Sequence, residues 1–234
     1  MRRPELIYCA NGNGRFAEIA INCGYTYGAQ LPGTVYFTPE FADQDWKTPN
    51  RDKYMAALAE HRPRIATVLD LERHDQLSEV LAWAEDAAQY ANTIIIIPKA
   101  CGAIAKLPRC VGGSDIRLGY SVPTKHGGTT VFAGEFVGWP VHLLGGNPGQ
   151  QMKLYHYFNV VSVDGNMIHK MATQYCKFWQ PGKRPFANSW PSLKQADGQA
   201  WGDGSETADA PYEAFERSCK NIMSAWRLVV GRGQ

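Results

Sequence analysis

The sequence has no long apolar run. No stretch approaches the roughly 20 uninterrupted apolar residues that a membrane-spanning helix needs. The first residues, MRRPELIYCANGNG, also lack the apolar core of a signal peptide. We therefore expect a cytoplasmic protein with no membrane partner, located in the host cytoplasm if a phage encodes it.

Closely spaced metal-binding residues are missing as well. The six cysteines include no CxxC pair, and the six histidines show no HxxxH-like spacing. A structural zinc site would need such spacing, so we predict no metal, no cofactor and reduced, mostly buried thiols. His142 lies inside an apolar run and is expected to make one buried hydrogen bond.

A strong charge of one sign is absent too. The net charge of +2 over 234 residues is too small to indicate a nucleic-acid binder by itself, so a local basic patch would have to supply that function. We find no internal repeat. With 44% hydrophobic residues, the chain is long enough for one sizeable core, and we expect a single domain over residues 1–234.

The chain does contain alternating strand and helix patterns. Short β-branched runs predict strands at residues 64–71, 93–97, 116–122, 140–144 and 160–163. Helical patterns lie between them, one opening at Thr48-Pro49, one over residues 75–90 and one capped by Asn147-Pro148. This α/β alternation predicts a parallel sheet, and the length fits a compact (β/α)8 TIM-like barrel.

Two further segments depart from this alternation. Residues 180–210 are rich in Gly, Pro, Ser and Asp and are interpreted as a long surface excursion, whereas residues 211–229 carry the apolar stripe of a C-terminal helix. The glycines between Asn11 and Gly14 do not have the spacing of a dinucleotide-binding fingerprint, and we interpret them as a loop.

Carboxylates stand at the ends of two predicted strands. Asp164 closes VVSVD, and Asp70 closes TVLD. In β/α barrels the loops after the strands build the active site, so both positions are candidates for catalysis. The simpler interpretation is that each aspartate caps a helix or forms a turn.

The segment PVHLLGGNPGQQMKLYHYFNVVSVDGNMIHKMA resembles the last two β/α units of the tRNA-guanine transglycosylase superfamily, which includes enzymes that place 7-deazaguanine bases into phage and bacterial DNA. His142–Gly146 and Val161–Asp164 match its leucine-glycine strand and its nucleophile strand. Thr67–Asp70 and Phe41–Asp43 are similar to two earlier strands that carry carboxylates. The cysteine-rich zinc motif of the tRNA-acting members is missing, which favours a DNA-acting, phage-type enzyme without zinc.

The resemblance implies a base exchange by double displacement at C1′ of the sugar. Asp164 is then the nucleophile and Asp43 the general acid and base, with Asp45 in reserve. Asp70 is expected to accept hydrogen bonds from N1–H and the exocyclic amine of a guanine-like base.

Other residues near the predicted strand ends receive substrate-binding roles. Gly145 and Gly146 let backbone amides approach the base, Asn166 contacts the sugar, and His126 lines the pocket or touches phosphate. The small-molecule substrate would be a free 7-deazaguanine base, as in queuosine-like modification.

A basic and aromatic stretch follows the catalytic strand. It contains Lys170, Lys177, Lys183 and Arg184, interleaved with Phe178, Trp179, Phe186 and Trp190. Cations suit phosphates and rings suit unstacked bases, so we predict contact with DNA, or with tRNA in its place. The same residues would also suit a solvated surface, and the sequence leaves a homodimer open.

Two alternatives to base exchange remain at this point. The same nucleophile would serve a base-releasing N-glycosidase or a nucleoside hydrolase. In the other alternative, the barrel binds nucleic acid without catalysis and its carboxylates are structural.

Overall fold

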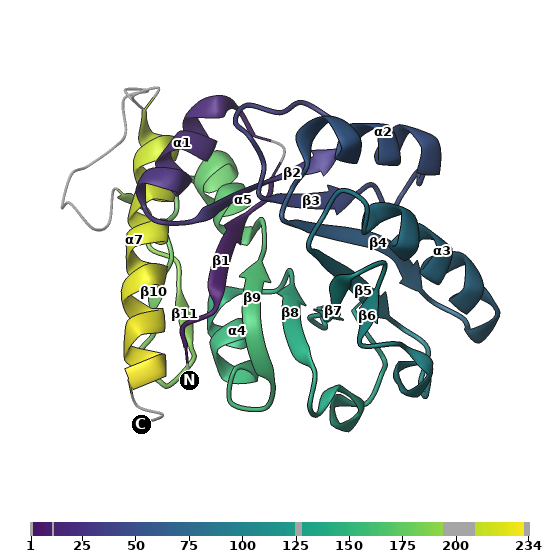
Figure 1. Ribbon diagram of the computed structural model, residues 1–234. Coiled ribbons are helices and arrows are strands. Elements are labelled where there is room, and N and C mark those ends of the chain that lie inside the picture. Colours follow the sequence, from purple (N-terminus) through teal and green to yellow (C-terminus); the bar gives the residue numbers. More distant parts are fainter. Residues whose placement is uncertain (1, 11, 125–127, 194–208, 232–234) are drawn as a thin grey trace.

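The computed structural model describes residues 2–10, 12–124, 128–193 and 209–231, and its central feature is a closed parallel barrel (Figure 1). Each barrel strand pairs with the next one along the chain, β7 follows β5, and β9 closes the ring on β1. The strands are β1 (Glu5–Tyr8), β2 (Thr26–Leu31), β3 (Phe41–Gln44), β4 (Ile65–Leu71), β5 (Thr93–Pro98), β7 (Ser114–Ser121), β8 (Pro140–Leu144) and β9 (Asn159–Asp164). The predicted (β/α)8 TIM-like barrel is confirmed.

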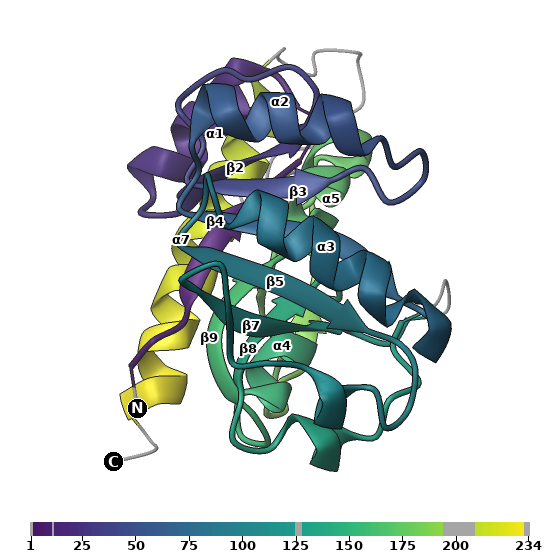
Figure 2. The ribbon, with the colours of Figure 1, turned by 45° about the vertical axis from the view of Figure 1, so that its right-hand side comes forward.

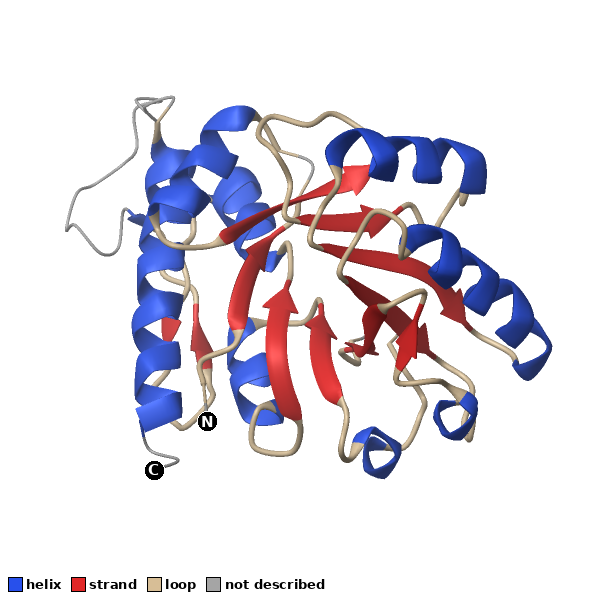
Figure 3. Ribbon diagram, viewed as in Figure 1, coloured by secondary structure: helices blue, strands red, loops and turns tan. Residues whose placement is uncertain are grey.

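Helices cover the outside of this barrel (Figure 3). They are α1 (Gly14–Asn22), α2 (Arg51–His61), α3 (Leu77–Ala87), α4 (Pro148–Leu154), α5 (Met167–Tyr175) and α7 (Ala210–Gly231). Figure 2 shows α2 and α3 along the outer side of β3, β4 and β5. None of the described helices has the length and apolar character to span a membrane.

Several connections are shorter than a full β/α unit. The link from β2 to β3, residues 32–40, contains no helix. The chain between β5 and β7 forms the one-turn 3-10 helix Ile104–Lys106 and strand β6 (Cys110–Val111), which pairs antiparallel with β7. A second 3-10 helix, Ala133–Phe136, precedes β8, and a third, His74–Gln76, precedes α3.

Asparagine side chains cap the starts of three helices, α1, α2 and α4. Asn147 caps α4 and Pro148 opens it, as predicted. The predicted start at Thr48-Pro49 is wrong, because α2 begins at Arg51 and the Asn50 side chain accepts from the Lys53 amide. The Asn11–Gly14 loop is also shorter than predicted, since Asn13 caps α1 at Gly14.

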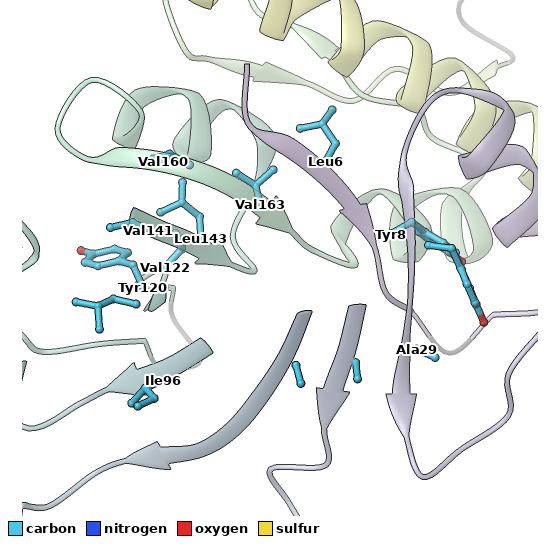
Figure 4. Packing of buried hydrophobic residues seen from close by; sticks show 14 of the residues in the cluster. Leu6, Tyr8, Ala29, Ile96, Tyr120, Val122, Val141, Leu143, Val160 and Val163 are labelled. Atoms are coloured by element: carbon cyan, nitrogen blue, oxygen red, sulfur yellow. The ribbon is translucent and has the colours of Figure 1, made fainter. Parts of the chain in front are cut away.

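Two apolar layers hold the barrel together. The larger lies between strands and helices, and Figure 4 shows Leu6, Val141 and Val163 in it on neighbouring strands. The smaller fills the barrel interior and comprises Ile7, Phe41, Ile65, Ile95 and Ile97. The Phe41 ring fits into this smaller layer because the neighbouring residue on β2 is glycine: a Cβ on Gly28 would lie 2.7 Å from the ring.

The C-terminal helix packs along one side of the barrel. Its predicted apolar stripe is confirmed, since these side chains are buried: Phe215, Cys219, Ile222, Met223 and Trp226. The start of the predicted surface excursion instead forms a small hairpin of β10 (Gln180–Pro181) and β11 (Asn188–Ser189). Trp179, next to this hairpin, is only 1% exposed, and residues 194–208 lie outside the described part of the chain.

Candidate active site

The ends of the parallel strands bring several chemically active side chains to one end of the barrel, which we call the mouth. Asp43 is the third residue of β3, Asp70 lies near the end of β4 and Asp164 ends β9. The three carboxylates predicted from the sequence are therefore presented at the same end, where β/α barrels carry their active sites.

Asp164 is held by the neighbouring strand and its loop. Its Oδ1 accepts from the Gly145 amide at 3.2 Å and lies 3.4 Å from His142 Nε2, and its side chain is 14% exposed. The helix-cap interpretation is wrong, because α5 begins at Met167 after Asn166 and is not capped by a side chain. Asn166 is exposed at this turn.

One glutamine ties the loop after β8 to the end of β9. Gln151 Nε2 donates to the carbonyls of Gly145 and Asp164, at 2.7 and 2.6 Å. Gln151 lies on α4 and is 6% exposed. The Asp164 backbone is therefore fixed by a buried contact, which restricts where its carboxylate can point.

Asp43 faces the charge of Asp164. Its Oδ1 accepts from the Thr67 hydroxyl at 3.0 Å, and Thr67 in turn accepts from the Gln44 amide at 2.8 Å. Burial raises the pKa of Asp43 to about 7, and the negative charge of Asp164 adds to the shift. Asp45, the reserve candidate, instead binds the Thr48 hydroxyl at 2.6 Å in the exposed turn before α2.

Asp70 is already paired in the structure. Lys99, directly after β5, forms an ion pair with it and lies 3.6 Å from Glu72. Burial raises the pKa of Asp70, and the hydrogen bond and charge of Lys99 counteract that rise. Lys99 could not be identified from the sequence, because a lysine after a strand is ordinarily a surface residue.

Cys9 is a second group that sequence reasoning missed. It follows β1 and is partly buried. Burial raises the pKa of its thiol, and the charges of Asp43 and Asp164 raise it further. The raised pKa keeps the Cys9 thiol protonated and weakly nucleophilic.

The predicted hydrogen bond of His142 is confirmed. Its Nδ1 lies 2.7 Å from Ser162 Oγ on β9, and both side chains are fully buried. The ring stacks on Phe41 at a centroid distance of 5.4 Å. The approach of His142 Nε2 to Asp164 was not predicted from the sequence.

Gly145 and Gly146 both adopt the left-handed conformation, with φ of 67° and 76°. A Cβ on Gly145 would meet no atom within 4 Å, whereas one on Gly146 would lie 2.6 Å from Val122. Both alanine substitutions carry the left-handed cost of roughly 1–2 kcal/mol. Overpacking adds roughly another 1–3 kcal/mol at Gly146.

We therefore expect Gly146→Ala to lower the unfolding free energy clearly more than Gly145→Ala does. Denaturant unfolding of both variants measures the difference. Val122→Ala in the Gly146→Ala background should recover part of the loss, because it removes the clashing methyl groups. Equal destabilisation by the two glycine variants would contradict this account of the turn.

The remaining predicted contacts are only partly brought to the mouth. His126 lies outside the described residues. Lys170 is exposed on α5, and Lys177 is partly buried after it. Lys183 and Arg184 instead line a groove of about 330 Å³ outside the barrel, between the hairpin, α4 and α7.

Two aromatic residues of the basic and aromatic stretch belong to the core. Phe178 and Trp179 are 5% and 1% exposed, so they are not available for stacking on bases, and that part of the prediction is wrong. Phe186 of this stretch is exposed, and further exposed rings lie in loops that follow strand ends. They include Tyr36 and Phe37 after β2 and Trp46 after β3, the last 64% exposed.

No cluster of three metal-binding side chains occurs among the described residues. The carboxylates of the mouth are ligands of the kind that a cation binds, but in the described part of the chain they do not form such a cluster. Lys99 already neutralises one of these carboxylates.

The chain belongs to a family described as a family of unknown function (DUF6610), which matches residues 20–227. No curated protein matches the sequence significantly. Among solved structures, it is similar to the YdjI aldolase from Escherichia coli K12, at 9% identity and a TM-score of 0.58. The match covers 97% of this chain and 91% of that one, and at such low identity it shows the fold alone.

Proposed function

We propose that this member of the DUF6610 family is a base-exchanging transglycosylase that replaces guanine by a 7-deazaguanine base in DNA. The observation that carries the proposal is the pairing of two carboxylates in different roles. Asp43 has a pKa of about 7 and faces the charge of Asp164, which is partly exposed and fixed by the Gly145 amide. A buried carboxyl that keeps its proton near neutral pH, at the same end of the barrel as a second carboxylate held by a backbone amide, supports the roles of acid and nucleophile.

In the first step Asp164 attacks C1′ as the bond from C1′ to the base nitrogen breaks. The protonated carboxyl of Asp43 gives its proton to the leaving base, and the sugar becomes an ester of Asp164. In the second step the incoming base returns a proton to Asp43 while its nitrogen attacks C1′ and releases Asp164. The sugar configuration is retained, as in other double displacements.

Base recognition is assigned to Asp70 and to the glycine turn. Asp70 accepts from N1–H and the exocyclic amine of the base, and the amides of Gly145 and Gly146 approach the ring. Because Lys99 already binds Asp70, the base must share that carboxylate or displace the lysine. The exposed rings of Tyr36, Phe37 and Trp46 offer stacking surfaces for a base taken out of the duplex.

Removing Lys99, the ion-pair partner of Asp70, should change the pKa of Asp70. In Lys99→Met we expect the pKa of Asp70 to rise further, because Lys99 is the group that opposes the effect of burial. A carboxyl-carbon NMR titration of the wild type and the variant measures the shift. Arg73→Met, which removes an exposed ion pair with Asp75, is the matched control and should leave Asp70 unchanged. An unchanged or lower pKa in Lys99→Met would contradict the pairing.

The decisive experiment is an exchange assay. The full chain is incubated with DNA that contains labelled guanine and with a free 7-deazaguanine base, and a parallel sample contains tRNA. Loss of label together with incorporation of the deazaguanine, read by mass analysis of nucleosides, supports the proposal. Loss of label without incorporation indicates a base-releasing glycosidase. Retention of label in both polymers rejects base exchange and base release on nucleic acid, and leaves a hydrolase of free nucleosides or a binding barrel.

A further inference from the structure

A chain of buried polar groups runs through the barrel interior to Asp164. Arg117 on β7 donates to Ser162 Oγ on β9 at 2.8 Å, and Ser162 Oγ lies 2.7 Å from His142 Nδ1 on β8. On the other side of the imidazole, Nε2 lies 3.4 Å from Asp164 Oδ1. Nε2 is fully buried and has no hydrogen-bond partner within normal distance among the described residues.

Arg117, the first group in this series of hydrogen bonds, determines the direction of the others. Arginine can only donate, so Ser162 Oγ accepts from Arg117, and among the described residues His142 Nδ1 is the acceptor that remains for the Ser162 hydroxyl proton. A neutral imidazole has one donor nitrogen and one acceptor nitrogen, so the proton is then on Nε2. The opposite tautomer would point a lone pair at the Asp164 carboxylate, which is unfavourable in a buried site.

Two nitrogens approach the same oxygen of Asp164, and of these two the Gly145 amide is the one that is hydrogen-bonded to it. The Gly145 amide and His142 Nε2 both approach Oδ1, at 3.2 and 3.4 Å. No hydrogen bond or ion pair reaches Oδ2 from the part of the chain that the structure describes. The imidazole cannot turn freely, because it is buried and stacked on Phe41 with an angle of 24° between the rings.

We propose that His142 is a positioning residue whose Nε2–H, set by Arg117 and Ser162, fixes Oδ1 of Asp164 and leaves Oδ2 as the attacking oxygen. This inference rests on the proposed function, because it assigns the reacting atom of the nucleophile. It adds that the protonation site of one fully buried histidine governs the orientation of the nucleophile.

The tautomer is measured without substrate. In ¹⁵N-labelled protein, two-bond correlations from the ring protons distinguish Nε2 from Nδ1, and the nitrogen shifts show which one carries the proton. We expect the Nε2–H form in the wild type. In Ser162→Ala the preference should weaken, because the donor to Nδ1 is lost. Ser114→Ala, which removes a buried hydroxyl bonded to the Ala91 carbonyl, is the matched control.

Kinetics in the exchange assay give a second readout. Ser162→Ala should lower kcat by roughly 10- to 100-fold with little change in KM, as expected for a lost hydrogen bond that orients a charged group. His142→Phe keeps a ring beside Phe41 but has no donor and should lose more. His142→Gln places an amide donor near the position of Nε2 and should recover part of the rate. Thermal unfolding of each variant confirms that it is folded.

The outcomes separate this inference from the proposed function. An Nδ1–H tautomer in the wild type, or an unchanged kcat in Ser162→Ala, overturns the inference even if base exchange is observed. If the tautomer is Nε2–H but no base exchange occurs, the hydrogen bonds exist as described but serve no catalysis. The assignment of Oδ2 as the attacking oxygen is then overturned as well. Support requires the Nε2–H tautomer and the selective loss of kcat together.

Discussion

Asp164→Asn is expected to reduce base exchange by about 10⁴-fold, a loss of the size seen when a member of a catalytic unit is removed. The substitution keeps the shape of the side chain and an oxygen for the Gly145 amide, so the fold should be retained. It removes the charge that attacks C1′. The measurement is the single-turnover rate of deazaguanine incorporation into DNA, together with a thermal unfolding curve for each protein.

The control for this substitution is Asp45→Asn. Asp45 has the same chemistry but lies in an exposed turn, where it binds the Thr48 hydroxyl. Its replacement should leave the exchange rate within a factor of about 2, since surface substitutions away from a site have small effects. Trapping a protein–sugar adduct in the wild type but not in Asp164→Asn would identify the ester. Full activity in Asp164→Asn would end the proposal.

Asp43→Asn is the second substitution with a large expected effect. General acid–base catalysis contributes about 10²- to 10⁴-fold, and an amide cannot transfer the proton, so kcat should fall by that amount. The wild-type rate should fall as the pH rises through about 7, because Asp43 must be protonated for the first step. That dependence should be missing in Asp43→Asn. A variant that keeps the same pH dependence would show that another group is the acid.

The same shift predicts a pH dependence of stability. The folded pKa of Asp43, about 7, exceeds the unfolded value near 4, so the folded protein binds more protons between those values. Stability is therefore highest below the unfolded pKa and declines as the pH rises, by up to about 1.4 kcal/mol per pH unit for one proton. Subtracting the unfolding free energy of Asp43→Asn at each pH isolates this contribution. A flat difference between pH 4 and 7 would contradict the raised pKa.

Five of the eight barrel strands, β4, β5, β7, β8 and β9, could be predicted from short apolar runs, whereas that pattern did not locate β1, β2 and β3, which are interrupted by polar residues or glycine or are very short. The strand at residues 140–144 is found as predicted, and the one at 93–97 extends by a single residue. Helix α1 was missed, because glycine at its first position and a preceding Asn-Gly-Asn sequence indicate a loop. The α2 start was misplaced by the preference for proline in the first turn, although Asn50 is the residue that caps it.

Of the candidate site, the sequence allowed prediction only of residues that lie at the ends of strands. Asp70 and Asp164 could be named because each closes an apolar run in a predicted strand, whereas Asp43 was named through the resemblance of Phe41–Asp43 to a strand of the transglycosylase superfamily. Lys99, Cys9 and the approach of His142 to Asp164 depend on which strands are neighbours, and this information appears only when the barrel closes. Phe178 and Trp179 were misassigned because sequence alone does not distinguish an exposed ring from one packed under a hairpin.

The contact between Gly28 and Phe41 has a consequence for the evolution of the family. The phenyl ring on β3 occupies the volume that a side chain on β2 would otherwise fill, and the interior is too closely packed to hold both. Relatives that carry a larger residue at position 28 should therefore carry a smaller one at position 41. Such paired replacements would show as co-variation between two adjacent strands in a sequence alignment, independently of any selection on catalysis.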